Sequence, residues 1–149
     1  MHARPSEQVA LIANIEPDQY GASTINTAAD KFQVIDMSQW HEVMVVLNVG
    51  TMESNATVDL NVTAGSTSVG TGTSVKSITQ LTEADSDDDK SVIVNVRSDE
   101  LGDDANRYLN VQVIIGTASV DLGCNVFGLE PRFAPASDLD LESVDQIVE

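Results

Sequence analysis

Cysteine, aromatic residues and basic residues are all scarce in this chain of 149 residues. The single cysteine, Cys124, excludes an intrachain disulfide, and one cysteine with two histidines argues against a structural zinc site. Three Phe, two Tyr and one Trp leave little for stacking on nucleic-acid bases. Seven Lys and Arg against 24 Asp and Glu give a net charge of −17, which repels phosphate backbones and anionic membrane surfaces. We therefore expect no nucleic-acid partner and no membrane partner.

Long apolar runs are also missing. No stretch approaches the roughly 20 apolar residues that a membrane helix needs, and the first residues contain no apolar signal-peptide core of about 7–15 residues. The length suits one domain that buries a sizeable core without covalent cross-links. We expect a soluble protein made in the cytoplasm.

What the sequence does contain is alternation of apolar and polar residues, which is typical of strands with one buried face. In "NRYLNVQVIIG" the residues Leu109, Val111 and Val113 point one way, and Tyr108 and Asn110 the other. The stretch "EVMVVLNVG" is apolar on both faces and predicts a central strand. Further strands are predicted at "ATVDLNVTA", "SVIVNVR" and "SVDLGCNVFG", with weaker ones at "KFQVID" and "TSVKSITQL".

Turn-rich segments separate these strands at intervals of roughly 10–15 residues, without helical periods between them. This pattern predicts an all-β fold, an antiparallel β-sandwich or jelly-roll-like single domain over residues 31–133. A helical turn is expected at "DMSQWHE", where Asp36 or Ser38 is the candidate cap.

The two ends differ from this core in composition. Residues 1–30 are expected to form an N-terminal arm that adds a strand to the sheet of a neighbour. Residues 134–149 are expected to form an acidic C-terminal tail with a short helix. Its apolar stripe would be Leu141, Val144 and Val148, with Ser137 as the N-cap.

Five carboxylates crowd the segment Glu83–Asp89, which precedes a predicted strand. The EF-hand pattern fails, because Lys90 and Val96 stand where the loop needs Gly and Glu. Two readings remain: a solvated hairpin loop, which we favour, or a looser calcium site. The candidate ligands of that site are Glu83, Asp85, Asp87 and Asp89. The acidic loop "DELGDD" could cooperate with it if both lie at one end of the sandwich.

No residue by itself supports catalysis. His2, His41 and Cys124 stand in no nucleophile elbow or other catalytic signature. Cys124 is in phase with Leu122 and Val126, as a small core residue would be. We expect that the chain is not an enzyme and that it needs no cofactor.

Four segments in a fixed order nevertheless carry a resemblance. They are "VIDMSQWHEVMVVLNVGT", the acidic loop and strand "EADSDDDKSVIVNVR", the long strand "NRYLNVQVIIGT", and the closing "GLEPRFAP". In order and spacing the chain resembles the capsid decoration, or cement, proteins of tailed bacteriophages. The resemblance covers roughly residues 30–135 and leaves out both ends.

The resemblance implies a β-sandwich on the outside of an assembled phage head, often as a homotrimer. Such a protein braces adjacent copies of the major capsid protein. The candidate interface residues are Val9, Leu11, Ile12, Trp40, Met44 and Val46, with core packing as the plainer reading of Trp40. The alternative function is a calcium- or carbohydrate-dependent binding module of a phage head or tail fibre.

Overall fold

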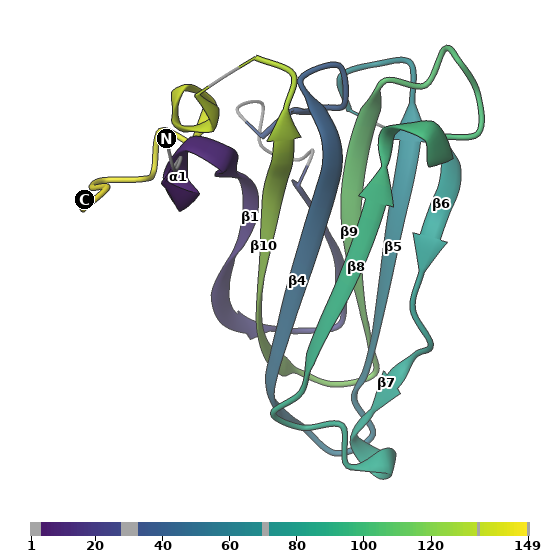
Figure 1. Ribbon diagram of the computed structural model, residues 1–149. Coiled ribbons are helices and arrows are strands. Elements are labelled where there is room, and N and C mark those ends of the chain that lie inside the picture. The colour runs from purple at the N-terminus through teal and green to yellow at the C-terminus, as the bar shows by residue number, and fades with distance from the viewer. Residues whose placement is uncertain (1–3, 28–32, 70–71, 134, 149) are drawn as a thin grey trace.

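The computed structural model describes residues 4–27, 33–69, 72–133 and 135–148, and in them two antiparallel sheets face each other (Figure 1). Sheet A has the order β1 (Val9–Tyr20), β10 (Val120–Pro131), β4 (Trp40–Met52) and β8 (Ser91–Arg97). Sheet B has the order β2 (Ser23–Asn26), β9 (Tyr108–Gly116), β5 (Thr57–Gly65) and β6 (Thr73–Ser77). The short strands β3 (Ile35–Asp36) and β7 (Leu81–Thr82) pair with β9 and β5. The expected all-β sandwich is confirmed.

Short helices occupy the ends and the connections of this sandwich. They are α1 (Pro5–Gln8) and the 3-10 turns η2 (Glu83–Asp85), η3 (Ser98–Glu100) and η4 (Ala136–Leu139). Among the residues described, no helix is long and apolar enough to cross a membrane.

Apolar side chains from alternate positions fill the space between the sheets. On β4, Val43, Val45 and Leu47 are fully buried, and on β9 Val111 and Val113 are fully buried. Each such side chain contributes roughly 1.5–3 kcal/mol when it leaves water. The strands expected from alternation are confirmed, and β4 is central in its sheet, as its two apolar faces predicted.

The first residues do not form the expected arm. Residues 9–20 form β1, which pairs with β10 of the same chain and buries Ala10, Ile12, Ala13 and Ile15. Its register shifts at Leu11/Ala13 and again at Ile15/Asp18, and these irregularities break the period of two. The sandwich therefore starts well before residue 31. The irregular register of β1 is the reason why alternation of apolar and polar residues did not predict this first strand.

The expected C-terminal helix is also wrong. Helical structure ends with the four-residue turn η4, and residues 141–148 adopt no helix. Instead the Leu141 N–H donates to the carbonyl of Leu11 at 2.8 Å, and the Leu11 N–H donates to Asp140 Oδ1 at 2.7 Å. Backbone hydrogen bonds to an edge strand thus replace the predicted helical turns.

Trp40 closes one end of the core. It is 1% exposed, and it lies directly against Gly128 of the neighbouring strand, where a Cβ atom would come within 2.4 Å of the indole ring. Gly128 therefore leaves the space that the ring occupies.

Replacing Gly128 with Ala should lower the free energy of unfolding by about 1–3 kcal/mol, because the indole or the strand must move. Urea unfolding followed by Trp40 fluorescence measures the change. Gly21→Ala is the matched control, since no atom lies within 4 Å of its added Cβ. Equal stability of both variants would contradict this account of Gly128.

Candidate functional site

The outer face of sheet A carries apolar side chains that the core does not cover. Cross-strand pairing sets them in rows: Leu11, Phe127 and Met44 stand side by side in one row. The next row places Val46 beside Ile93. We call this surface the outer apolar face, and its members are Val9, Leu11, Met44, Val46, Ile93, Phe127 and Leu129. Most are half-buried, and Ile93 is 60% exposed.

Charge is almost missing from these rows, although the chain carries −17. A third row runs from Val9 on β1 to Arg97 on β8. The three rows together hold one carboxylate, Glu42, and one cation, Arg97, and the two groups lie 3.9 Å apart. The remaining polar positions are the uncharged amides Asn14, Asn95 and Asn125. A neutral, partly apolar surface on a strongly acidic protein is suited to contact with another macromolecule.

The interface candidates divide between this face and the core. Val9, Leu11, Met44 and Val46 belong to the outer apolar face. Ile12 and Trp40 are 6% and 1% exposed and belong to the core. The sequence analysis did not single out Phe127, Leu129 and Ile93, although alternation against buried neighbours marked all three as outward-facing.

At its far end the same face is hollowed. A depression of about 580 Å³ lies beside Gly50 and Gly123, and Asp121 also lines it. Pro17, in the bulge of β1, packs over Gly123, where a Cβ atom would lie 3.1 Å from it.

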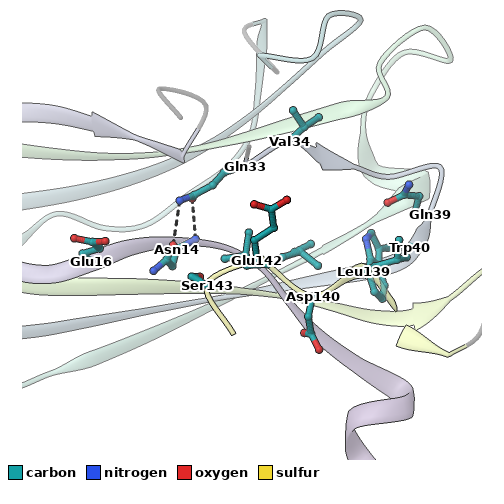
Figure 2. Close-up of a pocket in the computed structure, with 12 residues that line it drawn as sticks. Asn14, Glu16, Gln33, Val34, Gln39, Trp40, Leu139, Asp140, Glu142 and Ser143 are labelled. Carbon is teal, nitrogen blue, oxygen red and sulfur yellow. Dashed lines mark hydrogen bonds between the residues drawn. The ribbon is translucent and has the colours of Figure 1, made fainter. Parts of the chain in front are cut away.

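A second cleft, of about 370 Å³, opens along the free edge of β1 (Figure 2). The side chain of Gln33 stands against this edge: its Oε1 accepts from the Asn14 N–H at 2.9 Å, and its Nε2 donates to Asn14 Oδ1 at 3.1 Å. The C-terminal segment forms another wall through Leu139 and Asp140. Edge groups of β1 that would otherwise face solvent are thus occupied by this chain's own residues.

The acidic loop does not assemble the candidate calcium site. Its carboxylates accept hydrogen bonds from separate backbone groups: Asp87 from the Thr82 N–H at 2.9 Å, Asp88 from the Met52 N–H at 2.7 Å. Glu83 accepts from the Asn55 N–H at 3.2 Å. A hydrogen bond from Lys90 is the main cause that lowers the pKa of Asp87. In the described part of the chain no three His, Cys, Asp or Glu side chains converge as metal ligands do.

The two acidic loops cannot cooperate either. One precedes β8 and the other follows it, so they lie at opposite ends of the sandwich (Figure 1). The carboxylates of the first loop act as acceptors that bind it to Thr82 and to the backbone at the end of β4.

Cys124 and His41 are far from forming a catalytic pair. Cys124 is fully buried between the sheets, and burial raises the pKa of its thiol to about 12, which keeps it protonated. His41 lies on the solvent side of β4, in a shallow polar depression with Arg97 and Glu130.

Residues from three of the four segments of the resemblance gather at one end of the sandwich, whereas the acidic loop of the fourth segment lies at the other end. Arg107 donates from Nε to Asp36 Oδ1 at 2.7 Å and from Nη2 to Asp36 Oδ2, and its guanidinium lies 5.2 Å from the Tyr108 ring centre. Asp36 also accepts from the Ser38 N–H at 2.9 Å, so it closes the predicted turn as a cap. Burial raises the pKa of Asp36, but the bonds from Arg107 and Ser38 outweigh it and leave that pKa below its usual value. This pair holds β3 to β9.

Comparisons with known proteins assign no family. No family model and no curated protein matches the chain. Among solved structures it is similar to a chain of the Bacillus endospore appendages, a family of disulfide-linked pili (16% identity, TM-score 0.42, 87% of this chain and 96% of that one). It is also similar to the infectious bursal disease virus VP2 subviral particle (14%, 0.48, 87% and 33%) and to Triatoma virus (8%, 0.40, 88% and 68%). The chain spans about a third of the VP2 chain. These TM-scores lie below 0.5, and no functional argument follows from them.

Replacing Asp36 with Asn should lower the free energy of unfolding at neutral pH by about 1 kcal/mol, a small value because Arg107 is half exposed. The pKa of Asp36 is lowered by folding, so its contribution is present above the ordinary value of 3.8 and is lost as pH falls through the folded-state pKa. The difference between wild type and variant should therefore shrink towards zero in strong acid. Urea titrations at several pH values, with Asp145→Asn as the exposed control, measure it. A difference independent of pH would refute the assignment.

Replacing Asp88 with Ala should destabilise the chain by about 1–2 kcal/mol, because the Met52 N–H loses its acceptor. Asp88→Asn keeps an acceptor oxygen and should cost less. Melting temperatures of both variants, with EDTA and with excess calcium, test the two readings of the loop. A wild-type melting temperature that rises with calcium would favour the metal site.

Proposed function

We propose that this chain is a non-enzymatic structural protein of a virion that docks on the outer surface of an assembled phage capsid and stabilises the shell. The observation that carries the proposal is the outer apolar face of sheet A, a neutral surface on a chain of charge −17. The resemblance of the segment order to phage decoration proteins supplies the partner, the major capsid protein.

The outer apolar face supplies both affinity and orientation for such docking. Burial of the Phe127 and Met44 side chains against a shell subunit would provide the hydrophobic driving force. The amides of Asn95 and Asn125 stand beside these side chains and can form hydrogen bonds across an interface. The acidic loops lie beyond the ends of β8, and they would give the decorated particle a negative, solvated coat.

Stabilisation of the shell then follows from mass action. A protein that binds the assembled shell and has no affinity for its dissociated subunits shifts the equilibrium towards assembly. Many copies, each contacting more than one shell subunit, add to this effect through multivalency. The protein would be made in the cytoplasm of the bacterial host and would end on the exterior of the capsid.

Replacing Met44 with Lys should weaken binding to the shell at least tenfold, because a charge would be buried at the centre of the outer apolar face. The binding experiment mixes purified protein with undecorated heads built from the major capsid protein of the same phage and measures co-sedimentation. Thr24→Lys adds the same charge to an exposed site on sheet B and should bind like wild type. Wild-type protein that fails to sediment with heads would overturn the proposed function; unchanged binding of Met44→Lys would overturn only the docking face.

A further inference from the structure

The free edge of β8 differs from the edges of β1 and β6. The β1 edge is covered by Gln33, Asp140 and Leu141 and carries two register shifts. The β6 edge is short, contains Lys76 and has a register shift. Charges, bulges and covering segments are the devices by which proteins block unwanted strand pairing.

Strand β8 shows none of these devices from Ser91 to Val96. Its pairing with β4 is regular over seven residues, and between Ser91 and Asn95 it holds no charged residue and no proline. Its outward-facing Ile93 is 60% exposed. Core-facing Val92 and Val94 are only partly buried, whereas their partners on β4, Leu47 and Val45, are fully buried. The core row of sheet A therefore ends at β8, with no strand of the same sheet beyond it.

The directions of the peptide groups follow from the ladder with β4. The Val49 N–H donates to the Lys90 carbonyl at 2.8 Å, so by the alternation of antiparallel pairs Val92 and Val94 direct their peptide groups at β4. Ser91, Ile93 and Asn95 then direct theirs away from β4, to the free edge. Arg97 has the same parity, and its N–H is already bonded to Glu100 Oε2 at 3.0 Å.

We propose that β8 pairs with β8 of a second copy of this chain, antiparallel and about a twofold axis at Ile93. This register opposes Ile93 to itself and Ser91 to Asn95, which forms about six backbone hydrogen bonds and leaves the occupied Arg97 N–H unused. The two sheets A would join into one continuous sheet of eight strands.

The same register satisfies the side chains on both faces. On the core side, Val92 of one copy meets Val94 of the other in the closely spaced pairs and completes the truncated core row. On the outer side, the two exposed Ile93 side chains cover each other. Arg97 of one copy stands level with Asp89 of the other. Strand β8 itself contains no carboxylate, but each acidic loop at its ends would lie beside an acidic loop of the second copy, so the net charge of −17 opposes the pairing.

This pairing does not require the capsid shell, and it joins the chains about a twofold axis. A twofold strand pair makes assemblies of two chains, or multiples of two, whereas the resemblance to decoration proteins implies three. The mass of the protein in solution therefore distinguishes them. The pairing covers Ile93 and leaves the other members of the outer apolar face open, since they lie on strands away from the shared edge.

The test is light scattering of the wild-type protein over a range of concentrations and salt. We expect the mass of two chains, with an association that strengthens as salt screens the net charge. Ile93→Lys should raise the dissociation constant at least tenfold, because two cations would face each other across the axis. Ile114→Lys is the matched control: Ile114 is an exposed strand residue on sheet B, and its variant should keep the wild-type mass. A wild-type mass of one or three chains, or a two-chain mass for Ile93→Lys, would overturn the proposal.

A second variant tests the register without relying on loss of association. Ile93→Cys should form a covalent dimer under mild oxidation, since opposed residues of this pair type have Cα atoms about 5.5 Å apart, within disulfide reach. Ile114→Cys should remain a single chain. Cys124 does not interfere, because it is buried and protonated. A reduced, single-chain Ile93→Cys protein after oxidation would exclude the register.

Discussion

Backbone groups at the edge of a sheet must find partners, and this requirement organises sheet A. The central strands β4 and β10 have a hydrogen-bonded neighbour on both sides, whereas β1 and β8 each have a neighbour on one side only. At β1 the chain supplies partners internally, with a side-chain amide from Gln33, a carboxylate from Asp140 and one backbone bond from Leu141. At β8 the chain supplies no such partners. The edge there is regular and uncharged, and the valines beside it are only partly buried, which is the physical reason for proposing a second copy.

Charge divides the surface in a complementary way. Carboxylates concentrate in the loops on either side of β8 and in the C-terminal segment, while the rows around Met44 and Val46 on sheet A present apolar and amide side chains outwards. Loop carboxylates such as Asp87 and Asp88 bind backbone N–H groups, so they serve the local fold as well as solubility. A molecule of this kind stays dispersed through its net charge and keeps one neutral face for contact.

The segments that carry the resemblance to decoration proteins prove to be structural. Trp40 and Gly128 interlock across β4 and β10, and Asp36 binds Arg107 across β3 and β9, all at one end of the sandwich. Those residue types are needed there because a bulky ring requires a glycine opposite it and a half-buried carboxylate requires a bidentate cation. Such motifs indicate how the chain folds, and the docking surface has to be found from the outward-facing residues instead.

Local pattern alone determined the class of fold, the strands with regular alternation and the burial of Cys124, since each depends on the side-chain period within a few residues. The hairpin predicted for the acidic segment is wrong, because the segment joins β7 of sheet B to β8 of sheet A. Local pattern also offered Asp36, with Ser38 as the alternative, as the cap of its turn, but it held no sign of Arg107, which is 71 positions away along the chain. Tertiary structure decided the rest. Bulges in β1 break the alternation by which a strand is predicted. The C-terminal segment bonds to Leu11 and does not form the predicted helix. The pairing order of the strands places Ile93 and Phe127 on one face and leaves β8 at an edge. Strand order and edge exposure arise from contacts between distant segments, and no local period encodes them.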